Sequence, residues 1–382
     1  MQTTQTMDTD LMQELTRIEY YLEHEPANPH LLASAIDLHL AAGQTAQARN
    51  LADTATSLHP DDVFLRQRLG NVLIAQGELA QAERLFVALH CDSPHPALAY
   101  NLGYLCFRQQ RYTDAHDWLA PWVMNEEIPG DTIKLYIRVL HHLGELAHAV
   151  QFVERHRDGH SNDPDFLSLA SLLYLDSGQM DLAEQLNTEA LALGSQSLET
   201  SVAGGTIALR HGNTDAASRH FAQALRINPA DGRSWSGLGL ASMMNRDIPG
   251  AIARLESAVT HMPSHIGTHH ALGWCRILDQ DLSAAETCFR TALSLDRNFG
   301  ESHGGLAVTA ALQGDREFAQ ECIERAIRLN PESMSAAYAQ LILSDGVADT
   351  VKLRGLVRRF AGKRSGTPDG NLLKALLNSL ET

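Results

Sequence analysis

Apolar and polar residues alternate along this chain with the period of an α-helix, and the predicted helices come in pairs. The clearest pair lies in residues 232–265, where one apolar stripe is followed, after a short polar stretch, by a second. The residues that define the pattern are Trp235, Leu238, Gly239, Ala251, Leu255, Ala258 and Pro263. A single pair cannot cover its own apolar face, so it must stack on copies of itself.

The sequence contains nine copies of this pattern, which form a regular array. With places counted from the first residue of each copy, the copies begin at Pro29, Val63, Pro96, Gly130, Pro164, Leu198, Gly232, Ile266 and Gly300. Successive starts are 34 residues apart, except for one step of 33. Place 20 is alanine in all nine copies, and this small side chain lets the two helices of a copy approach closely. Place 15 is glycine in six copies, which is typical of a left-handed residue that ends a helix.

The array resembles the tetratricopeptide repeat, on the evidence of the residues named above for the copy 232–265. The resemblance implies an all-α fold, a right-handed α-solenoid of tandem helix-turn-helix units. It also implies a non-catalytic protein that holds a peptide or helix of a partner in the groove lined by the first helices. In the copy that begins at Ile266, core places 4 and 11 are His269 and Arg276, so its first helix is expected to be partly exposed.

The two ends of the chain depart from the repeat. Residues 1–28 are expected to form a tail over 1–9, followed by a helix that caps the array. Repeats one to three then occupy residues 29–128, and repeats four to nine occupy residues 129–333. Residues 334–382 are expected to form a degenerate tenth repeat and a leucine-rich C-terminal capping helix.

Pro121 interrupts the second helix of the third repeat. Proline lacks the backbone donor and clashes with the preceding turn, so this helix should stop or kink near Trp118. The residues that follow have turn composition. We expect either a seam in the solenoid at residues 121–131 or an ordinary irregular loop.

Charge and composition narrow the choice of partner. The formal net charge at pH 7 is −16, with 30 basic and 46 acidic residues, so nucleic acid is not an expected ligand. A basic segment at 352–364 is the exception to this acidic character. The five cysteines form no CxxC pair, and no stretch has the character of a signal peptide or a membrane span. A protein of the reducing cytoplasm is therefore expected, with no membrane span.

The first helices should expose the stripe formed by places 2, 5, 9 and 12, with places 6 and 13 at its margins. In repeats two to four this stripe is polar, aromatic and basic. Its residues are Gln67, Arg68, Asn71, Ile74, Tyr100, Asn101, Tyr104, Phe107, Arg108, Lys134, Arg138, His141 and His142.

Asn71 beside Asn101 is similar to the amide pairs with which some tetratricopeptide repeats hold a peptide backbone. The basic residues nearby favour an acidic or C-terminal peptide segment. The carboxylate clamp of the family has lysine where this chain has Gln67, which argues against a dedicated clamp. An ordinary solvated helix face is the alternative.

In repeats seven to nine the same stripe is apolar. It consists of Leu240, Met243, Met244, His270, Trp274, Ile277, Leu278, Gly304, Gly305, Val308 and Leu312. An exposed apolar surface of this extent favours a site for an amphipathic helix of a partner. Gly304 and Gly305 would then permit close approach of a ligand or another backbone. The alternative is that the stripe packs inward.

No enzyme, metal or cofactor motif is found in the sequence. His265 and His269 are four residues apart and could share a helix face, and His303 stands at place 4 one repeat after His269. No carboxylate or cysteine stands at ligand spacing with them, so stacked, hydrogen-bonded or solvated histidines are expected. The sequence favours an interaction scaffold or adaptor. The alternatives are a chaperone or assembly factor for a client of a secretion or envelope complex, and a homo-oligomer that assembles through the C-terminal helix.

Overall fold

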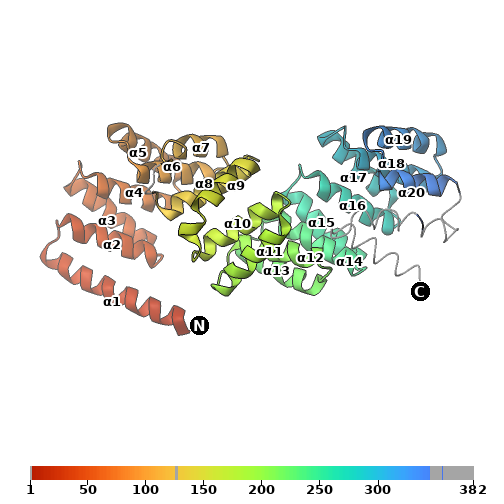
Figure 1. Ribbon diagram of the computed structural model, residues 1–382. Coiled ribbons are helices and arrows are strands. Elements are labelled where there is room, and N and C mark those ends of the chain that lie inside the picture. Colours follow the sequence, from red (N-terminus) through yellow and green to blue (C-terminus); the bar gives the residue numbers. More distant parts are fainter. Residues whose placement is uncertain (1, 125–127, 345–354, 356–382) are drawn as a thin grey trace. The chain divides into compact units, whose positions relative to one another are not determined.

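The computed structural model describes residues 2–124, 128–344 and 355, which form helices and no strands. The chain divides into two compact units, the N-terminal unit Met1–His156 and the C-terminal unit Arg157–Thr382. The N-terminal unit contains α1 (Gln2–His24), α2 (Pro29–Ala41), α3 (Thr45–Leu58), α4 (Val63–Ala75), α5 (Leu79–Asp92), α6 (Pro96–Arg108), α7 (Tyr112–Leu119), α8 (Gly130–His142) and α9 (Leu146–His156) (Figure 1).

The C-terminal unit begins with the short 3₁₀ helix η1 (Asp158–His160) and continues with eleven α-helices among its described residues. These are α10 (Pro164–Asp176), α11 (Met180–Ala192), α12 (Leu198–Arg210), α13 (Thr214–Ile227), α14 (Gly232–Met244), α15 (Ile248–His261), α16 (Ile266–Leu278), α17 (Leu282–Leu295), α18 (Gly300–Gln313), α19 (Arg316–Leu329) and α20 (Met334–Leu343).

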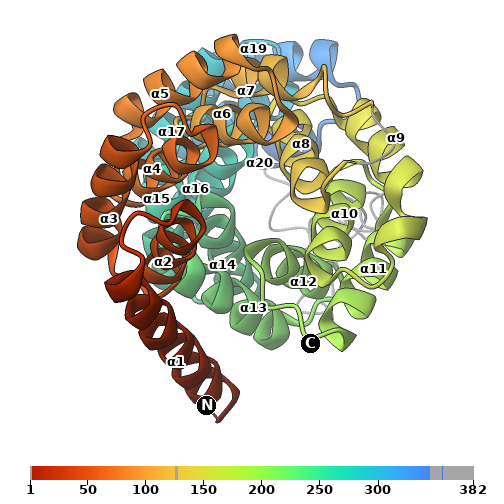
Figure 2. The same ribbon diagram turned by 90° about the vertical axis from the view of Figure 1, so that its left-hand side faces the viewer.

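The fold is the predicted α-solenoid of helix pairs. The first helix of each of the nine repeats begins at the predicted residue, from Pro29 to Gly300. The nine place-20 alanines have no exposed surface. The nine are Ala48, Ala82, Ala115, Ala149, Ala183, Ala217, Ala251, Ala285 and Ala319. In the N-terminal unit, α2, α4, α6 and α8 form an inner layer and the second helices an outer one (Figure 2).

Place 15 has the left-handed backbone conformation in every repeat. The six glycines at this place have φ between 71° and 84°, as predicted. The three repeats without glycine place Gln110, Arg246 and Gln280 there, with φ of 60°, 62° and 63°. The turn is therefore a property of the repeat geometry, which forces the conformation even on residues that disfavour it.

The N-terminal helix α1 packs on the first repeat. It begins at Gln2, so the segment expected to be a tail is helical. Leu15 is 3% exposed, and Leu22 packs against the core that α2, α3 and α4 share. The carboxylate of Glu19 lies 3.4 Å from Nε2 of His39.

The helix that contains Trp118 stops where proline predicts. α7 ends at Leu119, and residues 120–124 form turns. Residues 125–127 lie outside the described residues, and the seam at 121–131 stays a prediction. The compact units divide one repeat later, after His156.

The expectation of a partly exposed first helix in the eighth repeat is wrong. In α16, His269 and Leu272 are 6% and 7% exposed, and Cys275 is fully buried. Arg276 is half-buried, and its guanidinium forms ion pairs with Glu256 and Asp281 on the neighbouring helix and turn. Polar side chains can fill core places here because their polar atoms find partners.

The last described helix begins at the spacing of a tenth repeat. The Glu301 carboxylate accepts hydrogen bonds from Asn330 Nδ2 (3.1 Å), the Met334 backbone N–H (3.3 Å) and Ser335 Oγ (2.6 Å), and so fixes the start of α20. The predicted C-terminal helix (369–382) and the basic segment (352–364) lie outside the described residues. Among the described residues, no helix has the length and apolar character to cross a membrane.

Candidate functional site

The residues predicted for the first stripe lie on α4, α6 and α8, consecutive inner helices of the N-terminal unit. We call this set the polar-aromatic surface: Gln67, Arg68, Asn71, Tyr100, Asn101, Tyr104, Arg108, Lys134, Arg138 and His141. Arg108 is exposed and the others are half-buried. Each side chain can therefore contact solvent or a ligand while its helix stays anchored in the core.

Two amides join α4 to α6. Asn101 Nδ2 donates a hydrogen bond of 3.4 Å to Asn71 Oδ1. A primary amide carries two donor hydrogens and an oxygen with two lone pairs, so one shared bond leaves both side chains with donor and acceptor capacity. The backbone of an extended peptide offers the complementary N–H and C=O groups. The pair can therefore bind a peptide backbone without reading its side chains.

Tyrosine rings lie next to the amide pair on α6. The rings of Tyr100 and Tyr104 stack at 6.4 Å with an interplanar angle of 15°. Arg108 Nη1 donates to the Tyr104 hydroxyl at 3.1 Å, and its guanidinium lies 5.8 Å from the centre of that ring. The three side chains support one another along one face of α6 and present flat apolar area with polar edges.

Cationic groups of α8 act on Tyr100. Burial raises the pKa of the Tyr100 hydroxyl above 10.0, and Asp131 raises it further, while Arg138 and Lys134 oppose the shift. Lys134 Nζ lies 3.2 Å from Asp131 Oδ1, and the lysine side chain is only 15% exposed. The positive charges of α8 therefore lie near the tyrosines and are partly shielded from water.

The outer margin of this surface is aromatic. The rings of Tyr112 and His142 stack at 4.4 Å with an angle of 6°, and Phe107 lies 5.6 Å from Tyr112 and 5.4 Å from His142. Phe107 is half-buried and His142 is exposed. These rings extend the surface toward the C-terminal ends of α6 and α8.

Phe64 is a surface residue that the sequence reasoning missed. It is 70% exposed and stands at place 2 of α4, in line with Arg68 and Asn71 on the same helix face. Arg68 Nη2 lies 2.8 Å from Asp37 Oδ2 of the preceding inner helix. The signal was present in the sequence, because place 2 belongs to the stripe that was predicted to face outward.

The apolar stripe of the C-terminal unit packs largely inward. Leu240 and Met244 contact the core cluster that contains Phe221, and Met243 contacts the cluster that contains Leu255. These three residues are half-buried. They therefore contribute to the cores of the sixth to eighth repeats.

Trp274 and His270 fill the space between α16 and the helices that follow. The Trp274 ring lies 6.3 Å from Phe289 and 6.4 Å from Tyr338 of α20. His270 Nε2 donates to the carbonyl of Glu301 at 3.0 Å. Ile277 packs against the same cluster. Leu278 is the exposed member, at 56%, and Leu312 at the equivalent place of the next repeat is 43% exposed.

Gly304 and Gly305 serve packing within the solenoid. A methyl group on Gly304 would lie 2.5 Å from Cβ of Ser335 and 3.0 Å from the backbone nitrogen of Ala336. A methyl group on Gly305 would overlap the ring of Phe289. The approaching backbone foreseen from the sequence is therefore that of α20.

The place-4 side chains of repeats seven to nine each make the same kind of hydrogen bond. A ring N–H donates to the backbone carbonyl at place 32 of the preceding repeat. The bonds are Trp235 Nε1 to Pro229 (2.9 Å), His269 Nε2 to Pro263 (2.7 Å) and His303 Nε2 to Arg297 (3.0 Å). His269 and His303 thus take the place of the tryptophan N–H, and of the stacked, hydrogen-bonded or solvated states expected from the sequence they are hydrogen-bonded. The described residues hold no group of three side chains suited to bind a metal ion.

The cysteines are free thiols, and most lie in the core. Burial raises the pKa of Cys106 and Cys322 to about 11 and that of Cys275 to about 12. Cys91 is exposed. The buried thiols are therefore protonated at neutral pH and act as small apolar side chains.

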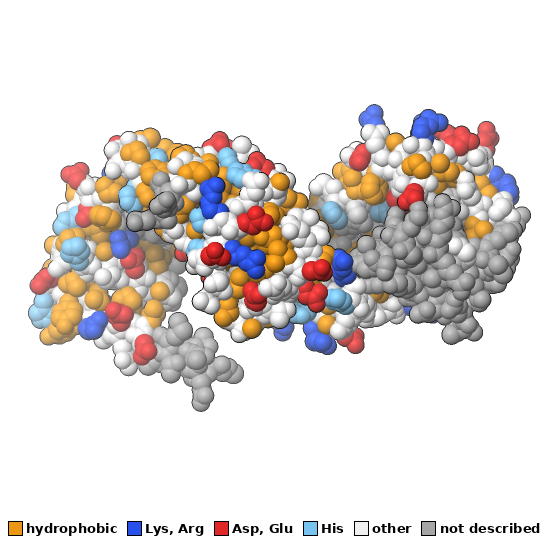
Figure 3. All heavy atoms as spheres, in the orientation of Figure 1, with side chains coloured by type: hydrophobic (Ala, Val, Ile, Leu, Met, Phe, Trp, Pro, Cys, Tyr) orange, Lys and Arg blue, Asp and Glu red, His pale blue; other side chains and the backbone are white. Residues whose placement is uncertain are grey.

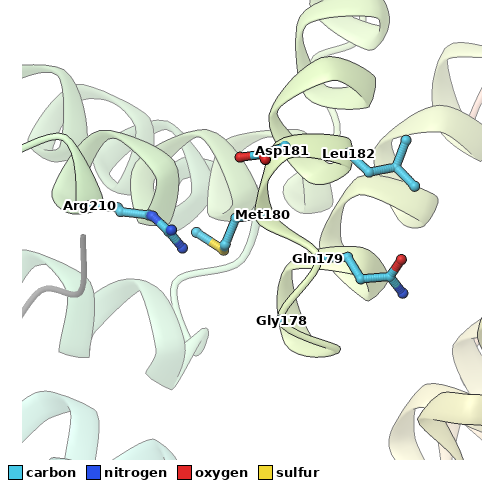
Figure 4. A pocket seen from close by; sticks show the side chains of 6 residues that line it. All are labelled: Gly178, Gln179, Met180, Asp181, Leu182 and Arg210. Atoms are coloured by element: carbon cyan, nitrogen blue, oxygen red, sulfur yellow. The ribbon is translucent and has the colours of Figure 1, made fainter. Parts of the chain in front are cut away.

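A hollow of about 340 Å³ lies where α10 turns into α11, beside the end of α12 (Figure 4). The residues that line it are Gly178, Gln179, Met180, Asp181, Leu182 and Arg210. Figure 4 shows the side chains of Met180 and Arg210 directed toward each other. None of the predicted contact residues lines this hollow.

Two family models, each described as a tetratricopeptide repeat, match the sequence. One matches residues 39–90, and the other matches residues 68–131 and again 202–264. The matches lie in both compact units. No curated protein matches the sequence.

Several solved structures are similar to this chain at low sequence identity. A monomeric mutant of IFIT1 with Gppp-AAAA is 15% identical, with 96% of this chain and 93% of that chain covered and a TM-score of 0.54. The human IFIT1 dimer with m7Gppp-AAAA is 16% identical, with coverage of 96% and 92% and a TM-score of 0.53. The APC/C hetero-tetramer Cut9-Hcn1 is 12% identical, with coverage of 89% and 94% and a TM-score of 0.49.

Proposed function

This chain belongs to the tetratricopeptide-repeat family, and we propose that it is a non-catalytic scaffold whose polar-aromatic surface binds an extended peptide segment of a partner protein. The contact between Asn101 and Asn71 carries the proposal, because it aligns two amides across neighbouring inner helices. Such a pair suits the alternating donors and acceptors of a peptide backbone. The stacked rings of Tyr100 and Tyr104 then offer contact area for the side chains of the peptide.

Charge favours a protein ligand over RNA, although human IFIT1 is seen with a capped tetranucleotide. The chain carries 46 acidic and 30 basic residues, and phosphate backbones need clustered cations. On the face shown in Figure 3, acidic and basic side chains are interspersed over the described residues. The local cations of α8 suit a single acidic side chain better than a run of phosphates.

The proposal predicts that Asn71, Asn101 and Tyr104, changed together to alanine, release the partners bound by the N-terminal unit. The amount of at least one co-purified partner should fall about tenfold, which corresponds to the loss of about 1.4 kcal/mol of binding. Quantitative mass spectrometry of proteins captured by the full chain measures this loss, and circular dichroism checks that the fold is unchanged.

A matched control changes similar residues elsewhere in the same unit. Asn50, Gln81 and Tyr20 are exposed on α3, α5 and α1 and lie outside the polar-aromatic surface. Their joint replacement by alanine should leave every partner bound. Retention of all partners by the first triple variant would show that the site assignment is wrong.

A second candidate function, a chaperone or assembly factor, draws support from Leu278 and Leu312. These exposed leucines occupy place 13 of consecutive repeats and could shield an apolar segment of a client, for example one from a secretion or envelope complex. In cells that lack this protein, a client should aggregate or be degraded, whereas a partner of a scaffold should stay soluble. Fractionation of the captured partners from such cells distinguishes the two functions.

A further inference from the structure

We infer that the polar-aromatic surface recognises a bipartite peptide, in which an aromatic or large apolar side chain packs on Phe64 and an acidic side chain lies near Lys134 and Arg138. The two side chains are separated by roughly five to six residues. The inference rests on the proposed function, since it assumes that the amides of Asn71 and Asn101 hold the intervening backbone.

Phe64 is a fixed apolar contact point. At 70% it has the largest exposed fraction among the large hydrophobic residues of the described chain. It lies in the first turn of α4, where Asp62 accepts a hydrogen bond of 3.0 Å from the Leu65 N–H and so caps the helix. Arg68 Nη1 also donates to the carbonyl of Phe64 at 3.3 Å. The ring is therefore presented by ordered backbone and does not owe its exposure to a frayed end.

The Phe64 ring is open to an apolar partner from outside the chain. No ring contact to Phe64 is found within the described residues. Removal of a phenylalanine side chain from water is favourable, so an apolar side chain of the peptide gains by covering it.

The acidic half follows from charge complementarity on α8. The Lys134 side chain is 15% exposed, whereas its partner Asp131 is 75% exposed. Asp131 raises the pKa of the Tyr100 hydroxyl while Arg138 and Lys134 lower it, so the two cations lie near α6 together with this acid. A carboxylate of the peptide that reaches this point meets Arg138 and Lys134 in a partly desolvated setting, where attraction is stronger than in bulk water, and competes with the exposed Asp131 for Lys134.

The separation follows from helix and strand dimensions. Phe64 lies on α4, and the cations lie on α8, two inner helices further along. Packed helices lie 8–10 Å apart, so two steps span roughly 16–20 Å. An extended peptide advances about 3.3 Å per residue, so roughly five to six residues cover this span. Asn101 is on α6, the inner helix between α4 and α8, and its amide together with that of Asn71 can bind the intervening backbone.

Selection from a random dodecapeptide library tests the inference. The library is displayed on phage and panned on the full chain, with the Asn71, Asn101 and Tyr104 triple alanine variant used to identify peptides that depend on the surface. The expected consensus has an aromatic or large apolar residue and an aspartate or glutamate five to six residues apart.

Affinities of one selected synthetic peptide then assign each half to its contact. Phe64→Ala should weaken binding about tenfold, and Lys134→Glu with Arg138→Glu should weaken it more. Each loss should disappear when the corresponding peptide residue is alanine. Tyr20→Ala and Arg17→Glu are matched controls on α1, since both residues are exposed outside the surface, and they should have no effect.

The outcomes separate the two claims. Peptides that need Asn71, Asn101 and Tyr104 but lack the aromatic and acidic pair, or carry basic residues instead, overturn the bipartite motif and leave peptide binding in place. A motif whose binding is insensitive to Phe64→Ala and to the α8 charge reversal also overturns it. Failure to select any peptide that depends on the triple site overturns the proposed function and the motif together.

Discussion

Replacement of Phe221 by alanine should lower the free energy of unfolding by about 3–5 kcal/mol. The side chain stands at place 24 of α13 and is 1% exposed, and it belongs to a core cluster with Ala208, Leu209 and Ala217. Its removal deletes a buried ring and leaves a cavity that helices packed on both sides cannot close. Urea denaturation of the full chain, followed by far-ultraviolet circular dichroism, measures the loss.

The expected loss of unfolding free energy is large because glycines on the neighbouring helices allow the Phe221 ring to pack directly against their backbones. A methyl group on Gly205 of α12 would lie 2.7 Å from Cε1 of Phe221, and one on Gly237 of α14 would lie closer still. Both distances are shorter than an ordinary van der Waals contact distance. The glycines of two successive inner helices therefore form a slot for one aromatic side chain, and Phe289 has the same arrangement with two other glycines.

Ile227 provides the matched control on the same helix. It is 46% exposed, so Ile227→Ala should cost less than about 1 kcal/mol. Gly237→Ala should be destabilising in its own right, by about 1–3 kcal/mol, because it overfills the slot. If Phe221→Ala cost no more than Ile227→Ala, the slot would not be a source of stability.

The helix positions could be predicted from the sequence because a repeat imposes the same packing problem many times. Ala48 belongs to the first repeat and Ala319 to the ninth. Each stands on the second helix of its repeat, where that helix approaches the first, and both are fully buried. Even Gln280, which offers no local signal for a turn, adopts the left-handed conformation that Gly314 adopts one repeat later. The position of a residue within the repeat therefore predicts its backbone conformation and burial better than the residue type does.

The exposure of the stripe could be predicted only in part. Tyr100 and Trp274 both stand in the predicted outward stripe of a first helix. Tyr100 belongs to the polar-aromatic surface, but Trp274 packs toward Tyr338, because Gly304 of α18 lets α20 approach closely. Helical periodicity gives the direction of a side chain, whereas the distance to the next repeat depends on residues far along the chain. The exposure of Phe64 could have been predicted, because it stands at place 2 of the same stripe.

Asn187 is the exception among the core residues at place 24. The other eight repeats have apolar residues there, all of them at most 1% exposed: Ala52, Phe86, Leu119, Val153, Phe221, Leu255, Phe289 and Ile323. Asn187 is 5% exposed, and its Oδ1 has no hydrogen-bond partner among the described residues. A buried carbonyl oxygen without a partner costs about 1–3 kcal/mol relative to its hydrated state.

Asn187→Leu should therefore raise the free energy of unfolding by about 1–2 kcal/mol, since it removes this cost and adds apolar contact of similar volume. Gly204 of α12 lies against this side chain, since a methyl group on Gly204 would lie 3.2 Å from Asn187 Nδ2 and 3.0 Å from the ring of His220. The reciprocal change, Leu255→Asn, should cost about 3 kcal/mol at the equivalent place of the seventh repeat. Urea denaturation of both variants measures the pair. A less stable Asn187→Leu variant would mean that the amide is required at this position, and the apolar pattern of place 24 would then not govern stability in the fifth repeat.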